Sequence, residues 1–343
     1  MQLIPYSLYP TFIRPLLFLM DAEHAHELTI KSASVIAKSP LVKLFAQDVD
    51  YRPVEVMGLL FKNPVGLAAG LDKNAEAIDF LGALGFGHIE VGTVTPKPQD
   101  GNLKPRMFRI KSAQGIINRM GFNNKGVDYL VNNIKNRKYD GVLGVSIGKN
   151  ETTPIENALD DYLICMKKVY QYADYIAVNI SCPNTKDLTK LQAKEPLMKL
   201  IGPLKQEQQK LKAQYQKYVP LVVKISPDLD DAMLETVCQI CLELKIDGIT
   251  CTNTTTTRDT VYGMPHAGEW GGLSGEPLRA LSNQTLVKVA AFTKGQIPII
   301  GVGGVSNIVS AREKLSNGAS LVQLYSSFVY RGPNVVKNIV SNL

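Results

Sequence analysis

The sequence has little of what specialised folds and binding proteins need. Its 343 residues include only five cysteines, four histidines and one tryptophan, and the net charge is a modest +7. No block of five or six basic residues occurs, which argues against a protein dedicated to nucleic-acid binding. An odd number of cysteines, mostly within apolar runs, argues against a disulfide scaffold and favours reduced thiols. With 45% hydrophobic and 20% charged residues, the composition is that of an ordinary globular protein.

Long hydrophobic runs are also lacking. The most apolar stretch, residues 3–20, is interrupted by three prolines and by Arg14, whereas a membrane-spanning helix needs about 20 apolar residues in a row. The stretch also lacks the basic region and cleavage site of a signal peptide. We expect short helical pieces there, followed by a helix over 22–38 that Asp21 caps. Residues 1–50 are interpreted as a packed helical subdomain, a surface that lies on a membrane, or an entrance for an apolar ligand.

Eight short apolar runs rich in Val and Ile follow from residue 60 onward. Each leads into glycine or polar residues, and most are then followed by a stretch long enough for a helix. Such runs are typical of parallel strands buried on both faces. Their repetition predicts an α/β protein with a (β/α)8 TIM barrel over residues 51–343, preceded by a helical extension. The predicted strands are 63–68, 88–91, 142–147, 175–180, 221–225, 248–251, 297–300 and 321–324. Residues 95–125, rich in Gly, Pro and Arg, predict a small hairpin over the barrel mouth.

Glycine and polar residues gather where the last two strands are expected to end. Gly303 and Gly304 follow the seventh strand, and Tyr325 and Ser326 follow the eighth. Barrel enzymes often hold a phosphate at this place, because glycines let backbone N–H groups approach the phosphate oxygens. A glycine turn alone is common in proteins, so the prediction of a phosphate site rests on the position of this turn after the seventh strand.

Other strand ends supply lysines, amides and one thiol. Lys73, Lys224 and several Asn and Thr side chains suit a planar, anionic ligand rich in amide groups. Cys182 is the only strong base or nucleophile among them, and it can serve as a base where neighbouring positive charge lowers its pKa.

The histidines and the other cysteines form no metal-binding pattern. Cys238 and Cys241 are spaced as C-x-x-C, but they lie in an apolar helical stretch with no second pair nearby. Core packing is therefore the simpler interpretation. We predict neither a metal site nor a Ser-His-Asp triad.

With these residues assembled, the sequence resembles dihydroorotate dehydrogenase, the flavin enzyme of pyrimidine synthesis, essentially from end to end. The resemblance is carried by residues 66–74 (GLAAGLDKN), 118–124 (NRMGFNN), 179–185 (NISCPNT) and 272–275 (GLSG). The N-terminal extension and residues 104–109 (KPRMFR) are similar to the membrane-associated, quinone-using class 2 members, whereas class 1 members lack such an extension. The resemblance implies oxidation of (S)-dihydroorotate to orotate on the route to UMP, with a membrane quinone as the final electron acceptor.

The resemblance also implies a role for individual residues. One FMN would lie across the barrel mouth with dihydroorotate stacked on it, and Cys182 would remove the ring proton while hydride passes to the flavin. The positions implied to contact FMN are Ala69, Gly70, Leu71, Asp72, Lys73, Thr93, Ser146, Asn179, Lys224, Thr252, Gly275, Gly304, Tyr325 and Ser326. Those implied to hold the substrate are Lys73, Asn118, Arg119, Met120, Gly121, Phe122, Asn179, Asn184, Asn253 and Thr254. His26 and Arg109 match positions that line the quinone tunnel of the family.

Two positions depart from the class 2 pattern. Class 2 members usually have serine as the base, whereas Cys182 is typical of class 1, and the family commonly has Asn where Ser146 stands. Cys182 therefore supports an alternative, a dihydroorotate dehydrogenase with a soluble acceptor such as fumarate. Because a thiol is more acidic than a hydroxyl, we expect Cys182 to work at lower pH than a serine. A third hypothesis, a membrane-associated binding protein without turnover, leaves the convergence of Lys73, Cys182 and Lys224 unexplained.

The extension further implies where the protein works. Peripheral membrane contact through the N-terminal helices is expected. The absence of a mitochondrial presequence before Leu3 favours the cytoplasmic face of a bacterial inner membrane. Because the extension is expected to occupy the surface that class 1 members use for dimerisation, we expect a monomer.

Overall fold

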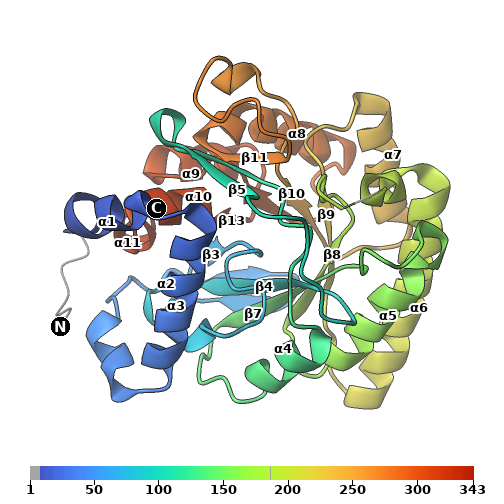
Figure 1. The fold of residues 1–343 in the computed structure, drawn as a ribbon. Coiled ribbons are helices and arrows are strands. Elements are labelled where there is room, and N and C mark those ends of the chain that lie inside the picture. The colour runs from blue at the N-terminus through green and yellow to red at the C-terminus, as the bar shows by residue number, and fades with distance from the viewer. Residues whose placement is uncertain (1–7, 186) are drawn as a thin grey trace.

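The computed structural model describes residues 8–185 and 187–343, and a closed parallel barrel forms its centre (Figure 1). The strands follow one another around the barrel in the order β10-β12-β13-β3-β4-β7-β8-β9. Nearly all are rich in Val and Ile, and every residue in them is buried, as parallel strands covered on both faces require. Their bounds are β3 (Val65–Leu67), β4 (His88–Val94), β7 (Val142–Ile147), β8 (Tyr175–Asn179), β9 (Leu221–Ile225), β10 (Gly248–Cys251), β12 (Ile299–Val302) and β13 (Leu321–Leu324).

The predicted TIM barrel is therefore confirmed, with small differences at the strand ends. The seventh strand begins at Ile299 rather than Ile297, since Pro298 between them has no N–H to donate to a neighbouring strand. The second strand is longer than predicted and continues to Val94.

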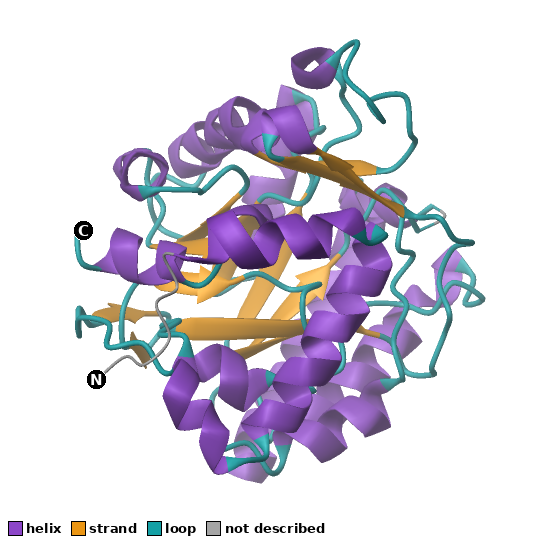
Figure 2. Cartoon of the chain, turned by 60° about the vertical axis from the view of Figure 1, so that its left-hand side comes forward, coloured by secondary structure: helices purple, strands orange, loops and turns teal. Residues whose placement is uncertain are grey.

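Helices surround the barrel on its outside (Figure 2). Asp230 caps one of them by accepting a hydrogen bond from the Met233 N–H, and Cys238 and Cys241 on the same helix are buried in the core. The predicted core packing of the C-x-x-C pair is therefore confirmed. The helices are α3 (Ile78–Ala83), α4 (Val127–Ile134), α5 (Ala158–Val169), α6 (Lys194–Tyr215), α7 (Asp231–Glu243), α8 (Arg279–Phe292), α9 (Ile308–Ser316), α10 (Ser326–Arg331) and α11 (Asn334–Val340).

Four helical segments form the N-terminal extension, which lies beside α10 and α11 (Figure 1). Asp21 caps the longest by accepting hydrogen bonds from the Glu23 and His24 N–H groups, as predicted. The Tyr9 hydroxyl donates to the Val329 carbonyl at 2.8 Å and ties the extension to the barrel. Residues 1–7 of the predicted extension, including Leu3, lie outside the described residues. The segments are a π-helix (Tyr9–Ile13), α1 (Arg14–Leu19), α2 (Ala22–Ala37) and a 3-10 helix (Pro40–Phe45).

Two small antiparallel sheets close the ends of the barrel. The hairpin of β1 (Val54–Val56) and β2 (Leu59–Phe61) packs Phe61 edge-on against His88 at the amino end. At the mouth, β5 (Met107–Ile110) and β6 (Gly115–Asn118) form the predicted hairpin. A third strand, β11 (Gly272–Gly275), joins β6 from far along the chain. Its Gly-Leu-Ser-Gly sequence carries no strand signal, so only the tertiary structure defines it.

Candidate active site

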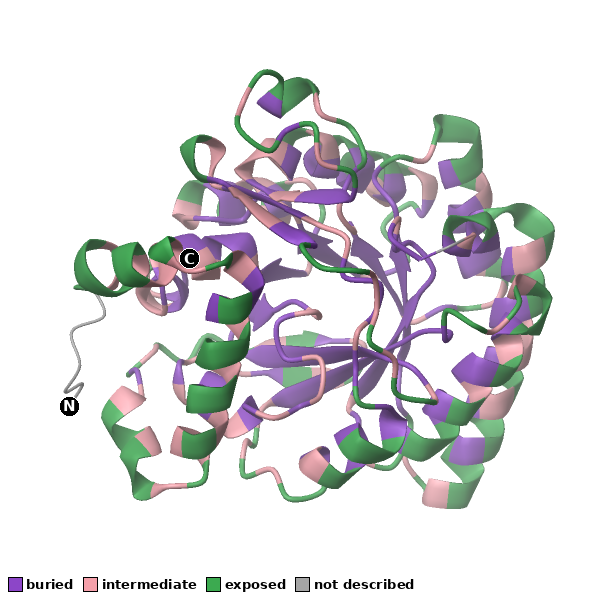
Figure 3. Ribbon diagram, viewed as in Figure 1, coloured by how far each residue is buried: buried purple, intermediate pink, exposed green. Residues whose placement is uncertain are grey.

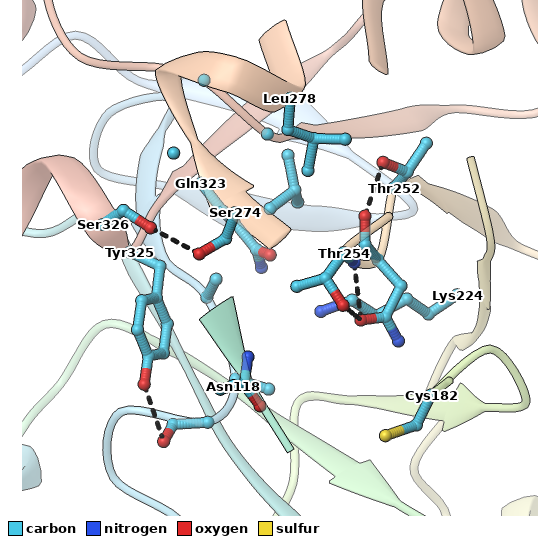
Figure 4. A pocket seen from close by; sticks show the side chains of 18 of the residues that line it. Asn118, Cys182, Lys224, Thr252, Thr254, Ser274, Leu278, Gln323, Tyr325 and Ser326 are labelled. Atoms are coloured by element: carbon cyan, nitrogen blue, oxygen red, sulfur yellow. Dashed lines mark hydrogen bonds between the residues drawn. The ribbon is translucent and has the colours of Figure 1, made fainter. Parts of the chain in front are cut away.

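A cavity opens among the carboxyl ends of the barrel strands, and residues of β6 and β11 form part of its wall (Figure 4). It draws together side chains from strand ends that are far apart in the sequence, as the barrel topology requires. The predicted residues that line it are Ala69, Gly70, Lys73, Thr93, Asn118, Met120, Gly121, Phe122, Asn179, Cys182, Asn184, Lys224, Thr252, Asn253, Thr254, Gly275, Gly304, Tyr325 and Ser326.

Cys182 lies in the segment after β8 and is buried at the wall of this cavity, on the same side as Lys224 (Figure 4). Burial raises the pKa of the Cys182 thiol, and the Asn184 N–H and the Lys224 ammonium only partly oppose the rise. The pKa of Cys182 is therefore raised, whereas the sequence led us to expect that it is lowered. Removal from water destabilises the thiolate more than the single Lys224 charge stabilises it.

A hydrogen-bonded row of polar side chains crosses the floor of the cavity. The Asn179 amide donates to the Thr93 hydroxyl at 2.8 Å, and that hydroxyl lies 2.8 Å from the hydroxyl of Ser146. The Asn253 amide in turn donates to Asn179 at 3.3 Å and to Ser181 at 3.0 Å. Ser146 itself is fully buried and does not line the cavity. Its hydroxyl contacts Thr93, which lines the cavity, and Ser146 therefore orients the Thr93 side chain and does not contact a ligand itself.

The turn after β12 requires glycine at two successive positions. Gly303 and Gly304 have φ values of +111° and +73°, which glycine adopts without strain. A Cβ on Gly304 would lie 2.3 Å from the Cβ of Arg279, so no larger residue fits. Across the cavity wall, the hydroxyls of Ser274 and Ser326 lie 2.8 Å apart (Figure 4).

The cavity also contains buried polar atoms that lack hydrogen-bond partners within the described residues. Such atoms are costly unless an occupant satisfies them. They fit a ligand with ring amides, carbonyls and hydroxyls better than an apolar one. The atoms that belong to lining residues are Gln114 Oε1, Asn184 Oδ1, Gln323 Oε1 and Ser327 Oγ.

Sequence reasoning missed Gln114 and Gln323. Gln323 had a readable signal, because it is the one amide within the otherwise apolar strand Leu321–Leu324. Gln114 lies in the tight turn between β5 and β6, where it has a left-handed conformation, and nothing local in the sequence points to the cavity.

Two charged residues of the predicted site point elsewhere. The Asp72 carboxylate accepts hydrogen bonds from the Glu76 and Ala77 N–H groups at 2.8 and 2.7 Å, and it thereby holds the backbone turn after β3. Burial raises the pKa of Asp72 to about 6. Arg119 points away from the cavity: its guanidinium pairs with Glu269 at 2.7 Å and lies over two aromatic rings, Phe108 and Trp270.

A second cavity lies between the N-terminal extension and the barrel. Its walls are mainly aliphatic and aromatic, and both His26 and Arg109 line it. Leu71 faces this cavity rather than the first, and Tyr325 borders both. Burial and the nearby Lys73 charge lower the pKa of His26 to about 3, so its imidazole is neutral at physiological pH.

A buried ion pair attaches the extension to the barrel mouth. The Arg106 side chain donates to the Glu23 carboxylate of α2 through Nε and Nη2, the latter at 2.7 Å. Its other terminal nitrogen donates to the Asp100 and Asn102 carbonyls, both at 2.6 Å. Burial favours protonation of Glu23, but the cations of Arg106 and Lys104 outweigh it and lower the pKa of this carboxyl.

Together these features define a class of protein: a (β/α)8-barrel enzyme with a polar reaction site at its mouth and a separate apolar chamber beside it. Comparison with known proteins agrees. The profile of the dihydroorotate dehydrogenase family matches residues 52–343. The chain belongs to the dihydroorotate dehydrogenase family and is an oxidoreductase.

Several similar proteins are named as quinone-linked members. The dihydroorotate dehydrogenase (quinone) of Psychromonas ingrahamii is 55% identical over 331 residues, 96% of this chain and 98% of the relative. The dihydroorotate dehydrogenase (quinone) of Aeromonas salmonicida is 56% identical over 336 residues, which cover 98% of this chain and 100% of the relative. The ligand-free DHODH structure from Eimeria tenella superposes with a TM-score of 0.85 at 38% identity and covers 94% of this chain and 93% of that one. These names do not favour the soluble-acceptor alternative raised by Cys182.

Proposed function

We propose that this chain oxidises (S)-dihydroorotate to orotate with FMN in the mouth cavity, and that a membrane quinone is reduced from the apolar cavity. The single observation that carries the proposal is the pair of cavities that both border Tyr325, one lined by many charged, amide and hydroxyl side chains and the other mainly by aliphatic and aromatic ones. A polar, anionic substrate and an apolar acceptor require different surroundings, and this arrangement supplies one for each. When bound in the mouth cavity, FMN would supply the acceptor for hydride and the donor of electrons to the quinone.

The residues around the mouth cavity fit FMN. The Gly303–Gly304 turn and the hydroxyls near it suit the phosphate, and the Lys224 ammonium favours negative charge on the reduced ring system. Thr93 and Asn179 are held in place by Ser146 and Asn253. The remaining residues proposed to contact the cofactor are Ala69, Gly70, Lys73, Thr252, Gly275, Tyr325 and Ser326, with the backbone at Leu71 and Asp72.

The substrate is proposed to be held by amide side chains. Asn118, Asn179, Asn184 and Asn253 offer donors and acceptors that match the amide edges of the dihydroorotate ring. The Lys73 ammonium suits the substrate carboxylate, and burial lowers its pKa to about 8, still above neutral pH. Thr254 and residues 120–122 complete the wall of this part of the cavity.

Cys182 is proposed as the base. Its thiolate would take the proton from one ring carbon, so that Sγ holds the proton. The adjacent ring carbon would lose its hydride to the flavin, and the C=C bond of orotate would form between the two carbons. The buried position excludes water from the proton transfer. The Lys224 charge, which opposes the raised pKa of the thiol, helps to keep a fraction of the thiolate available.

The helical extension, residues 8–50 in the described part of the chain, is proposed to admit quinone from a membrane surface. Phe12, Leu16 and Leu19 are exposed by 61%, 67% and 86%, and Figure 3 shows this face of the extension as exposed. Apolar side chains of this kind favour peripheral docking at a bilayer surface. Among the described residues, no helix combines the length and hydropathy that crossing a bilayer takes. A monomer at the cytoplasmic face of a bacterial inner membrane is the arrangement we propose.

Anaerobic mixing of the purified flavoprotein with dihydroorotate tests the first half of the proposal. The absorbance of the oxidised flavin should disappear in a single turnover, and heat denaturation of the protein should release FMN as the only flavin. A protein that contains FMN but is not bleached by dihydroorotate would contradict the assigned substrate.

Narrowing the apolar cavity should separate the two half-reactions. Thr29 lines its mouth on α2, and a Thr29→Trp variant is expected to slow reoxidation by quinone while bleaching by dihydroorotate keeps its rate. Val35, 66% exposed on the same helix and absent from the wall of the apolar cavity, provides the control Val35→Trp. Equal slowing of both half-reactions in Thr29→Trp would place quinone elsewhere.

Removal of the Ser146 hydroxyl should weaken flavin binding without abolishing it. A Ser146→Ala variant removes one of the two buried hydrogen bonds of the Thr93 hydroxyl and leaves the one from the Asn179 amide. Loss of one such bond costs about 0.5–1.5 kcal/mol and corresponds to roughly 2- to 12-fold weaker flavin binding. Titration of the flavin-free protein measures the effect. Unchanged affinity would mean that Ser146 does not orient Thr93.

A further inference from the structure

Lys314 on α9 is a buried cation without a buried anion beside it. Its exposed fraction is 1%, and its ammonium donates to the Ser282 hydroxyl at 2.8 Å and to the side-chain amide oxygen of Asn283 at 2.7 Å. Within the described residues, no carboxylate oxygen lies within 4.0 Å of it. Fully buried lysines are rare unless an opposite charge compensates for the loss of water. Burial of the Lys314 charge therefore destabilises the folded state, and the two neutral hydrogen-bond partners do not fully compensate for the lost hydration.

The Lys314 side chain lies directly behind the turn after β12. A Cβ added to Gly301 would lie 2.8 Å from the Lys314 Cδ. The Ser282 hydroxyl, which accepts from Lys314, donates to the Val302 carbonyl at 2.5 Å. The same hydroxyl oxygen lies 2.8 Å from where a Cβ on Gly303 would stand. One hydroxyl thus separates the ammonium from the backbone of the glycine turn that borders the mouth cavity.

The other charges near this turn largely cancel and are partly in water. Arg279 pairs with Glu313 at 2.5 Å and lies 3.9 Å from Glu276, which borders the cavity. The side chains of Arg279, Glu276 and Glu313 are exposed by 29%, 28% and 41%. Solvent screens charges of this exposure, whereas a charge at Lys314 acts through the protein interior. Lys314 is thus the least screened charge behind the turn.

We propose that Lys314 is the buried counter-charge of the flavin phosphate and that it makes the site select FMN over riboflavin, which lacks the phosphate. The inference rests on the proposed function, since it assigns the phosphate to the Gly303–Gly304 turn. A phosphate there would supply the anion that the surroundings of Lys314 lack, and Lys314 would add attraction that backbone N–H groups alone do not provide. Burial lowers the pKa of Lys314 to about 8, and a nearby dianion favours its charged form.

The test compares two flavins on the full-length, flavin-free protein. Dissociation constants for FMN and riboflavin are measured by fluorescence titration in the wild type and in Lys314→Met, which keeps the length of the side chain and removes its charge. We expect Lys314→Met to weaken FMN binding by at least about tenfold, as loss of one unscreened charge implies, and to leave riboflavin binding within about twofold. Lys288→Met is the control. It removes an equal charge on α8 from an exposed ion pair with Asp231 of α7, and the affinities for FMN and riboflavin should both stay unchanged.

The FMN-to-riboflavin ratio separates an electrostatic role from a structural one. If Lys314→Met weakens both flavins equally, or neither, the proposal is wrong, because packing and hydrogen bonding at Ser282 do not depend on the phosphate. Should that variant fail to fold, Lys314→Gln keeps a donor for Asn283 and is expected to show the same loss of selectivity. A wild type that binds no FMN would contradict the proposed function itself, whereas a wild type without preference for FMN would contradict only the role of Lys314.

Discussion

A Cys182→Ala variant is expected to reduce its flavin with dihydroorotate about 100- to 10,000-fold more slowly than the wild type, the usual contribution of a positioned base. The cause is the loss of Cys182 Sγ, the one thiol among the described residues that line the cavity, from a buried position. Orotate binding should change little, because the amide side chains that hold the ring remain. Stopped-flow bleaching measures the first quantity and orotate titration the second.

The pH dependence of the same reaction identifies the base. Because burial raises the pKa of Cys182, only a minor fraction is thiolate at neutral pH, and the rate of bleaching should rise with pH up to that raised pKa. In Cys182→Ser, whose hydroxyl is much less acidic, the profile should move to higher pH. A profile that is the same in both proteins would show that residue 182 is not the proton acceptor.

The second large effect concerns stability. Arg106→Met should lower the free energy of unfolding by about 3–5 kcal/mol, because it leaves the buried Glu23 carboxylate of α2 with only the exposed Lys104 ammonium beside it. The loss should lie above the pH at which Glu23 becomes protonated, since the lowered pKa of this carboxyl stabilises the fold only while it is ionised. Denaturant titration at pH 7 measures it.

Two variants show whether the effect comes from the buried charge. Glu23→Met combined with Arg106→Met should recover much of the lost stability, since no uncompensated charge remains. Lys104→Met removes an exposed partner of Glu23 and Glu27 and should cost less than about 1 kcal/mol. If the double variant is as unstable as Arg106→Met alone, the loss comes from the carbonyls of Asp100 and Asn102 rather than from Glu23.

Much of the barrel and of its site could be predicted because both depend on local pattern. Apolar runs such as 142–147 define strands by themselves, and parallel strands in a barrel place their carboxyl ends together whatever the detailed packing. Cys182, Lys224 and the Gly303–Gly304 turn therefore meet in one cavity, as expected. The strand β11 could not be predicted, because it exists only through pairing with β6.

Side-chain direction and electrostatics could not be read from the sequence. Arg119 belongs to a matching motif, yet Glu269 and two aromatic rings draw its guanidinium away from the cavity. Ser146 follows the strand pattern but lies one layer below the cavity floor. The direction of the pKa shift at Cys182 depends on how far desolvation outweighs the Lys224 charge, which only the packed structure defines.

The central claim is that one protein joins dihydroorotate oxidation at the barrel mouth to quinone reduction beside the N-terminal helices. Steady-state oxidation of dihydroorotate by the purified protein, with a short-chain ubiquinone and with fumarate in parallel assays, tests it most directly. We predict rapid turnover with the quinone and none with fumarate. Turnover with fumarate alone would contradict the account, and it would mean that Cys182 marks a soluble-acceptor enzyme whose apolar cavity serves another ligand.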